Sequence, residues 1–487
     1  MGKIALFGMA PLPFEPALRH HAPGVRTWQL ARPLLRAGHD LHLFLCRYEE
    51  AYAGGAPTTL ALPEGRGAAS LFSPSEFFGD TLEHRLAGGA FDLFVGASAR
   101  PSARAASLCG EAPLWADLFG HTLAEGQCKA ILHGSDDLLL DYFRTEVEVL
   151  LRADAISTVS DAQELAVLGE LGLAGRLNAR TGGHRFAFAI PCAGVEADPV
   201  RPSDPPLRGA VVPVDAFVAL SIGGYNTWAD VPTLHAGLER AMDAEPTLHF
   251  VSTGGELEGQ DHETYGRFTR LVEASRHRER FHLLGWVAPD LLRRCLADAD
   301  AAVCVDRDLA ESRLGSRNRI PACLAHGLTV IASRVSEASI YLEEAAVGLT
   351  FPPGDSETFA RLLAGAVSMR DVLRGRRAGI AATALSDLSL EVTARPLVAF
   401  AAAPRRAPDA GSENGLGAKL LSEGRALDGK DREIAKLRER LASAGQHVSN
   451  LEALVAEKDG AIAELRAFQE KVRASLPFRL RDLLRGR

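Results

Sequence analysis

Residues 281–333 read FHLLGWVAPDLLRRCLADADAAVCVDRDLAESRLGSRNRIPACLAHGLTVIAS, and this stretch decides the fold. Short apolar runs alternate in it with amphipathic runs, and glycines or polar turns separate them. The pattern predicts five segments: a strand ending at Gly285, a helix from about Pro289 to Ala299, a strand Ala301–Val305, a helix to about His326 and a strand Leu328–Ala332. This βαβαβ order predicts an α/β fold, with a parallel sheet covered by helices.

A polar loop separates the second predicted strand from the second helix. It carries Glu311, Ser316, Arg317 and Arg319 around Gly315. Ligands of open α/β sheets bind at the carboxyl ends of strands, and a helix N-terminus favours anions. Arg317 and Arg319 are therefore candidate donors to a diphosphate, and Glu311 is a candidate acceptor for sugar or ribose hydroxyls. The alternative interpretation of this loop is a solvated surface turn.

A second glycine-containing turn lies upstream of this stretch. Residues 216–222 predict the first strand of a Rossmann-like unit, and Gly223 and Gly224 follow it directly. Two glycines at a strand end let the backbone approach a phosphate closely, although an ordinary tight turn is the alternative. Another predicted strand, residues 248–253, ends at Gly254 in the same way.

The N-terminal part of the chain repeats the strand–helix–strand order. Residues 3–8 and 39–46 predict strands on either side of a helix over 25–37, without a GxGxxG motif. A later strand, residues 113–119, is followed by polar residues, and we single out Asp117 and His121 as candidate catalytic or binding residues. Simple solvation of a loop histidine is the alternative for His121.

In order and spacing, roughly residues 1–400 resemble the glycosyltransferases of the GT-B fold, close to family 4. The motifs that carry the resemblance are ADAISTVSDAQ (153–163), LGLAGRLN (171–178), LSIGGYNTWADVPTL (220–234), GWV (285–287), ADAAV (299–303), Glu311 before GSRNR, and AHGLTVIAS (325–333). The resemblance implies two Rossmann-like domains facing a cleft, with the last helices, near Leu390–Ala402, crossing back to the first domain.

One position departs from the family pattern. Many family 4 enzymes carry two glutamates separated by seven residues in this loop, and the second usually contacts the donor ribose. Counted from Glu311, the second position is Arg319. The role of the first glutamate therefore transfers to Glu311, and the role of the second does not transfer.

Further site roles combine the resemblance with the residue patterns. The expected donor-binding residues are Gly223, Gly224, Trp228, Asp230, Gly254, Ser316, Arg317 and Arg319. The expected catalytic residues are Glu311, His121 and Asp117. Gly24 and Arg26 belong to the loop expected on the acceptor side, although Arg26 as a plain surface residue is the alternative.

Length and composition restrict the classes of function. The 487 residues are enough for two or three domains, and 47% of them are hydrophobic. The formal net charge of −8 argues against a nucleic-acid-binding protein. The seven cysteines form no CxxC pair and no metal-ligand spacing, which indicates reduced thiols in a cytoplasmic protein. The resemblance implies no bound metal, and no cofactor is expected besides the donor substrate. The N-terminus has no signal-peptide pattern, and no apolar run is long enough to cross a membrane.

The predicted domain boundaries follow shifts in composition. The expected parts are an N-terminal Rossmann-like domain 1–196, a proline-rich linker 197–212, a C-terminal donor domain 213–403 with a cross-over helix, a flexible linker 404–418, a coiled coil 419–472 and a basic amphipathic tail 473–487.

The C-terminal segment carries a heptad repeat. Apolar residues recur every seven positions from Leu420 to Ile462, with leucine, alanine or valine at most d positions and lysine at Lys430 and Lys458. This pattern predicts a coiled coil, and hence a homodimer, while a helix folded on its own body is the alternative. The tail interleaves arginine with leucine, which suits peripheral contact with an anionic inner membrane surface or a solvated terminus.

These observations and the resemblance favour a glycosyltransferase that uses a nucleotide-diphosphate sugar as donor. The resemblance implies a glycan or lipid-linked acceptor and a role in cell-surface polysaccharide synthesis. The resemblance implies a metal-independent reaction, with retention of configuration favoured over inversion. Two alternatives stay open. One is a non-catalytic scaffold built on a degenerate transferase body, and the other is a sugar-nucleotide epimerase with the same fold.

Overall fold

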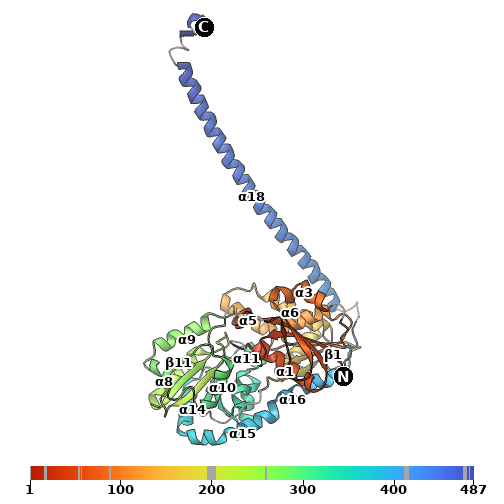
Figure 1. Cartoon of the computed structure of the whole chain (residues 1–487), viewed down its shortest axis with the longest axis vertical. Helices are drawn as coiled ribbons and strands as arrows, with labels where there is room; N and C mark the ends of the chain where they lie inside the picture. The colour runs from red at the N-terminus through yellow and green to blue at the C-terminus, as the bar shows by residue number, and fades with distance from the viewer. Residues whose placement is uncertain are drawn as a thin grey trace. The chain divides into compact units, whose positions relative to one another are not determined.

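The computed structural model describes the chain except for residues 1, 16–18, 53, 54, 56, 87, 88, 195–203, 258, 259, 411–415, 475–479, 482 and 487. Residues 1–412 form one compact unit and residues 413–487 form another. The first unit contains two parallel-sheet domains (Figure 1), which confirms the predicted α/β class with two Rossmann-like domains.

The first domain is built on a sheet of eight strands in the order β3-β4-β2-β1-β5-β6-β7-β8. All neighbours run parallel except β3 and β4. The strands are β1 (Lys3–Ala10), β2 (Asp40–Arg47), β3 (Thr59–Leu60), β4 (Arg66–Phe72), β5 (Leu93–Gly96), β6 (Leu114–Asp117), β7 (Ala155–Thr158) and β8 (Ala187–Ala189).

Two apolar layers, one on each face, bury this first sheet. β1 is central and contributes Ala5 and Phe7 to one layer and Ile4 and Leu6 to the other, as the alternation of side chains along a strand requires. The helices of the domain are α1 (Ala22–Arg36), α2 (Pro74–Phe78), α3 (Asp80–Leu86), α4 (Ala99–Leu108), α5 (Thr122–His133), α6 (Leu139–Arg152) and α7 (Asp161–Leu173), with a 3-10 turn η1 (Glu49–Ala51).

The second domain is built on six parallel strands in the order β11-β10-β9-β12-β13-β14. The strands are β9 (Phe217–Ile222), β10 (Leu248–Thr253), β11 (Phe281–Leu283), β12 (Ala301–Cys304), β13 (Thr329–Ser333) and β14 (Gly348–Phe351). The helices are α8 (Val231–Ala244), α9 (Glu263–Glu273), α10 (Pro289–Asp298), α11 (Ala310–Leu314), α12 (Arg319–Ala325), α13 (Glu337–Glu344), α14 (Ser356–Ser368) and α15 (Arg370–Leu388), with a 3-10 turn η2 (Arg278–Arg280).

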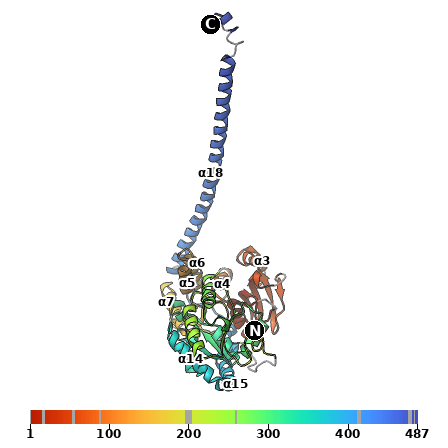
Figure 2. The same ribbon diagram turned by 90° about the vertical axis from the view of Figure 1, so that its left-hand side faces the viewer.

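The chain returns from the second domain to the first through its last helices. In both Figure 1 and Figure 2, α15 of the second domain lies at the end of the body away from α3 of the first domain. After α15, the short helices α16 (Leu390–Thr393) and α17 (Arg395–Ala402) pack against α1. Leu397 and Ala401 enter the core of the first domain, and the ring of Phe400 lies 5.3 Å from that of Trp115. Residues of the second half of the sequence therefore complete the first domain.

The two segments predicted as linkers are partly packed into the domains. Residues 195–203 lie outside the described residues, but Leu207 is fully buried in the core of the second domain, and Arg208 is ion-paired with Asp298 and Asp300. Within the other predicted linker, 404–418, Asp409 pairs with Arg176 at 2.7 Å. Proline and alanine content suggested flexible chain, but these apolar and charged side chains have specific partners that composition does not reveal.

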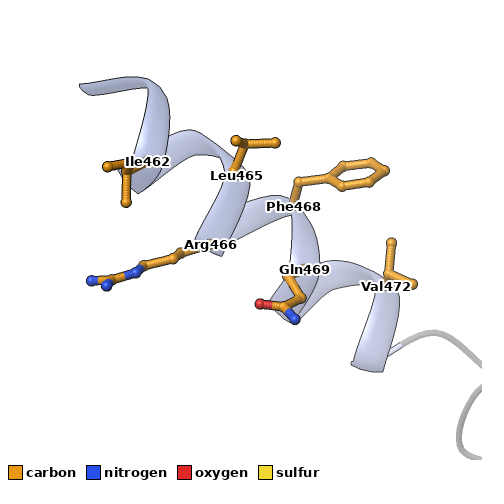
Figure 3. A pocket seen from close by; sticks show the side chains of 6 residues that line it. All are labelled: Ile462, Leu465, Arg466, Phe468, Gln469 and Val472. Atoms are coloured by element: carbon orange, nitrogen blue, oxygen red, sulfur yellow. The ribbon is translucent and has the colours of Figure 1, made fainter. Parts of the chain in front are cut away.

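The second unit contains the helix α18 (Leu416–Ala474). Apolar side chains form a stripe along it and are exposed, and Figure 3 shows its last part, where Ile462, Leu465, Phe468 and Val472 line a shallow groove. The predicted helix is present, while pairing with a second helix stays a prediction. Residues 475–479, 482 and 487 of the predicted basic tail lie outside the described residues.

Two absences hold for the described part of the chain. No helix there is both long enough and apolar enough to span a bilayer. No group of three or more histidine, cysteine, aspartate or glutamate side chains there is arranged to hold a metal ion.

Candidate functional site

The strand order of the second sheet reverses at β9, which lies between β10 and β12. Such a topological switch point is where open α/β sheets bind ligands, outside the carboxyl ends of the strands. The loops that follow β9 and β12 are joined there. Asp230 N donates to Val305 O at 2.9 Å, and Arg307 N donates to Trp228 O at 2.7 Å. The polar loop and the glycine turn, predicted separately, therefore follow strand ends whose loops are bonded to each other.

The glycines of this site allow close packing of the chain. Gly254 has a φ of +148°, and a Cβ at this position would lie 2.0 Å from the carbonyl oxygen of Gly223. The amide of Gly223 donates to Thr253 O at 2.8 Å, and that of Gly254 donates to Gly285 O at 2.7 Å. Both amides are therefore used inside the protein, and the approach of a diphosphate to Gly223 and Gly224 stays a prediction.

Arg317 lies at the centre of a buried ion cluster. Its side chain is 3% exposed, Nε donates to Asp306 Oδ2 at 2.7 Å, and Nη2 donates to Glu311 Oε2 at 2.9 Å. Burial would lower the pKa of Arg317, but the charges of Glu311 and Asp306 outweigh it and raise the pKa above its usual range. This corrects the prediction that Arg317 offers free forked donors to a diphosphate, because two carboxylates already bind them.

Arg319 has a different environment. It begins α12, and its Nη2 donates to the carbonyl oxygen of Gly224 at 3.0 Å. No carboxylate lies within ion-pair distance of it among the residues that the structure describes. Ser316, three residues earlier in the same loop, forms a hydrogen bond with the thiol of Cys192, a residue of the first domain. Arg319 is therefore a half-buried cation with a neutral partner, at the predicted position.

Trp228 and Asp230 shape the loop after β9. The Arg317 guanidinium lies over the Trp228 ring, 5.2 Å from its centre. Asp230 caps α8, because its Oδ1 accepts from Thr233 N at 3.2 Å and its Oδ2 accepts from Thr233 Oγ1 at 2.7 Å. Trp228 thus packs at the ion cluster, while Asp230 holds the helix that follows the loop.

Several buried polar atoms near these strand ends have no hydrogen-bond partner among the described residues. They are Thr253 Oγ1, Asp306 Oδ1, Ser312 Oγ and Asn318 Nδ2. Buried polar atoms are normally bonded, so these four are available to a polar ligand or to ordered water. Our sequence reasoning did not assign these four residues. A signal was available for Thr253 and Asp306, since each lies at or just after the end of a predicted strand.

Asp117 and Arg26 form an ion pair inside the first domain. Both side chains are 0% exposed, and Arg26 Nη2 donates to Asp117 Oδ1 at 2.7 Å. Asp117 also accepts from Ser157 Oγ at 2.7 Å and from the amide of Ser98 at 3.1 Å. Asp117 is thus fully engaged by protein donors. Arg26 is neither a surface residue nor a loop residue, because the predicted acceptor-side loop is the first part of α1.

The same helix explains Gly24. A Cβ there would lie 2.2 Å from the carbonyl oxygen of Pro11, so the glycine lets the start of α1 approach the end of β1. This corrects the expectation that Gly24 lies in an open loop. Its role in this structure is close packing.

His121 caps α5 and belongs to a separate acidic cluster. Its Nδ1 accepts from the amide of Ala124 at 3.3 Å, and its Nε2 lies 3.1 Å from Glu170 Oε1. Burial, followed by the charge of Glu170, raises the pKa of the nearby Glu146 to about 8. Burial would lower the pKa of His121, but Glu170 raises it on balance. His121 is therefore bonded to the helix that it caps and to Glu170, and a catalytic role for it stays a prediction.

Polar contacts join the two domains beside the site. Ser160 Oγ donates to Leu314 O at 2.6 Å, and Gln29 Nε2 lies 3.3 Å from Asn318 Oδ1. Lys129 of α5 reaches Asn226 of the second domain, with 2.9 Å between Nζ and Oδ1. Our sequence reasoning missed Lys129, because its position on a helix of the first domain gave no sign of a contact with the second.

The second domain also matches a known family. Residues 217–368 match the family model described as Glycosyl transferases group 1. No curated protein matches the chain significantly. The matched segment contains β9, β10, β12 and the polar loop, so it includes the strand ends described above.

Solved structures share the architecture of the whole body. Sucrose-phosphate synthase from Thermosynechococcus elongatus superposes with a TM-score of 0.62 at 17% identity, over 82% of this chain and 98% of that one. HepE of Anabaena, in complex with UDP-glucose, gives 0.58 at 13% identity, over 83% and 100%. The E. coli structure described as trehalose-6-phosphate bound with UDP-2-fluoro glucose gives 0.59 at 12% identity, over 83% and 100%. The chain therefore shares the two-domain fold of these proteins, and its second domain is similar to the glycosyl transferases of group 1.

Proposed function

We propose that this protein transfers a glycosyl group from a nucleotide-diphosphate sugar to a hydroxyl of a glycan or lipid-linked acceptor. The match of residues 217–368 to the group 1 glycosyl transferases carries the proposal. The position of the unpartnered polar atoms at the switch point supports it, since that is where a donor of this kind would lie. A role in cell-surface polysaccharide synthesis belongs to the same proposal.

Each residue of the candidate site would have a distinct role in this transfer. Arg319 would neutralise charge that develops on the leaving diphosphate. Glu311 has both carboxylate oxygens on Arg317, but each oxygen keeps a lone pair that can accept from a sugar hydroxyl. Asp306 Oδ1 offers another such acceptor. Arg317 would act as a positioning residue, because it fixes both acids and touches no ligand itself.

The proposed reaction uses side-chain charges for the diphosphate, so it requires no metal ion. The resemblance to a retaining family favours retention of the anomeric configuration. Proton NMR of the first-formed product, recorded before mutarotation, distinguishes retention from inversion. An inverted product would remove this part of the proposal without affecting donor use.

The experiment that tests the function combines binding with turnover. UDP-, GDP-, ADP- and dTDP-sugars are screened by thermal shift, and the best donor is then incubated with and without glycan acceptors while the released nucleoside diphosphate is measured. We expect one donor to stabilise the protein and to be consumed faster with an acceptor. Lack of any stabilisation at millimolar concentrations would contradict the proposal.

The same experiment separates the two alternatives. Donor binding without turnover in the presence of any acceptor indicates a scaffold on a transferase body, which Arg319 at the second glutamate position favours. Conversion of the sugar nucleotide to an isomer, without release of nucleoside diphosphate, indicates an epimerase.

A further inference from the structure

Lys129 is a buried cation without an anionic contact. Its side chain belongs to α5 of the first domain, and the residue is 3% exposed. No carboxylate lies within 4.0 Å of Nζ among the described residues, whereas buried charges in proteins are normally paired. Burial lowers the pKa of Lys129, and the more distant charges of Glu125, Asp261 and Glu311 oppose this only in part. The ammonium group therefore lies in an environment that does not balance its charge.

The two acceptors that do contact Lys129 are weak ones. Asn226 Oδ1 also accepts from the amide of Thr227 at 2.9 Å and from its hydroxyl at 3.0 Å, so three donors share one amide oxygen. The other acceptor, the carbonyl oxygen of Gln260, is 3.4 Å away, near the limit for a hydrogen bond. An anion could replace these contacts at small cost.

The acid closest in sequence does not neutralise Lys129. Glu125 lies one helical turn earlier on α5, yet the two side chains form no ion pair. Burial raises the pKa of Glu125, and although the charge of Lys129 lowers it, the charge of Glu311 raises it further. Glu125 is thus a poor counter-charge, and the missing anion is more naturally a ligand than a side chain.

A second cation with neutral contacts reaches the same loop. Arg319 donates to Gly224 O, and Lys129 contacts Asn226, two residues further along the chain after β9. The centre of the Trp228 ring lies 6.0 Å from Lys129 Nζ and 5.2 Å from Arg317 Cζ. Because two acids already bind Arg317, Lys129 and Arg319 are two cations at this loop that have only neutral hydrogen-bond partners among the described residues.

We propose that Lys129 and Arg319 together bind the diphosphate of a nucleotide ligand, so that the first domain supplies one of the two cations. The inference deepens the proposed function and rests on it. Its consequence is that donor binding strengthens the contact between the domains, because Lys129 then bridges α5 and the loop after β9 through a doubly charged group. A ligand that bears only one phosphate would reach both cations less well.

The test uses the full-length chain with Lys129→Met, which keeps an unbranched side chain and removes the charged ammonium group. Lys129→Arg is the rescue variant, and Arg313→Met is the matched control, since Arg313 is an exposed cation of the polar loop paired with Asp308. Calorimetry measures the affinity for UDP and for inorganic pyrophosphate, and thermal unfolding is recorded with and without UDP.

We expect Lys129→Met to weaken UDP binding about ten- to hundredfold, with most of the affinity kept in Lys129→Arg and all of it in Arg313→Met. The unfolding temperature of the ligand-free Lys129→Met protein should equal or exceed that of the wild type, because the variant removes an unbalanced buried charge. A purely structural lysine would give the opposite result, with lower stability and unchanged UDP affinity, and that result overturns the inference.

Further binding measurements show which anion Lys129 contacts, and they distinguish a failure of this inference from a failure of the proposed function. If Lys129→Met loses affinity for glucose 6-phosphate but not for UDP or pyrophosphate, the lysine serves a phosphorylated acceptor, and the diphosphate assignment is wrong. If the wild type binds UDP and Lys129→Met binds it equally well, only the role of Lys129 fails. If the wild type binds neither UDP nor any nucleotide sugar, the proposed function itself fails.

Discussion

Two arginines in the same loop, Arg317 and Arg319, have opposite roles. Arg317 is enclosed by Asp306 and Glu311, whereas Arg319 contacts only a backbone carbonyl among the described residues. Sequence reasoning treated them as a pair, because their spacing is the same as that of two donors to one phosphate group. The difference arises from where the acids lie after folding. A cation that has two acids as partners contributes to stability, and one with a neutral partner is available to a ligand.

Arg317→Met and Arg319→Met should therefore fail in different ways. Arg317→Met leaves two buried carboxylates without a partner, and we expect a loss of about 3–5 kcal/mol of stability. Arg319→Met should leave the denaturation midpoint nearly unchanged but weaken UDP binding about tenfold or more. Guanidinium denaturation and calorimetry measure the two effects. Equal stability of both variants would show that the ion cluster does not hold the loop.

Glu146 makes stability depend on pH through its buried position beside Glu170. Burial raises the pKa of Glu146 to about 8, well above its value in an unfolded chain. The folded protein therefore favours the protonated acid, and its contribution is complete below about pH 4.3 and is lost as the pH rises through 8. We expect the unfolding temperature of Glu146→Gln to fall less than that of the wild type as the pH rises from about 4.3 to about 8. If the unfolding temperature of the variant falls as much as that of the wild type, other titrating groups cause the pH dependence.

At the scale of elements, the described residues just before position 411 are part of the first domain. Asp409 pairs with Arg176, Ala407 is buried, and Arg406 contacts Glu111. A chain that ends at Ser412 keeps these contacts, and one that ends at Pro404 leaves Arg176 buried without its partner. We expect the shorter chain to be less stable by about 3–5 kcal/mol. Chemical denaturation of both chains measures this, and equal midpoints would mean that the segment contributes nothing.

The helix α18 exposes an apolar stripe that one helix cannot bury. β-branched residues at several a positions with leucine at d favour a two-stranded coiled coil. We predict that the full chain dimerises and that the chain ending at Ser412 is a monomer. Sedimentation equilibrium at tens of micromolar measures both masses.

A matched pair of substitutions tests whether the stripe causes this association. Val455→Glu places a charge in the stripe, while Ala453→Glu places the same charge on the opposite side of the helix. We expect only Val455→Glu to produce monomers. Monomeric wild-type protein, or dimers in both variants, would exclude pairing through the predicted seam.

At the scale of the molecule, local pattern predicted the strands and the ends of strands, and the structure bears this out at β9, β10 and β12. The glycine turn and the polar loop could be found because each follows an apolar run directly. Contacts between distant parts could not be found. Arg26 and Asp117 are 91 positions apart, and Lys129 and Asn226 are 97 apart, in different domains. Periodicity contains no information on such pairs, since packing of whole elements decides them.

The length of α18 affects how the size of this protein can be measured. Its 59 residues, with a rise of about 1.5 Å each, span about 90 Å whatever direction the helix takes. Hydrodynamic drag depends on extension more than on mass, so even a single copy should elute early from a sizing column and diffuse slowly. Removal of a small fraction of the mass, residues 413–487, should then change the Stokes radius far more than the mass. The elution volume will therefore depend on the length of the helix, and the oligomeric state has to be determined from the mass.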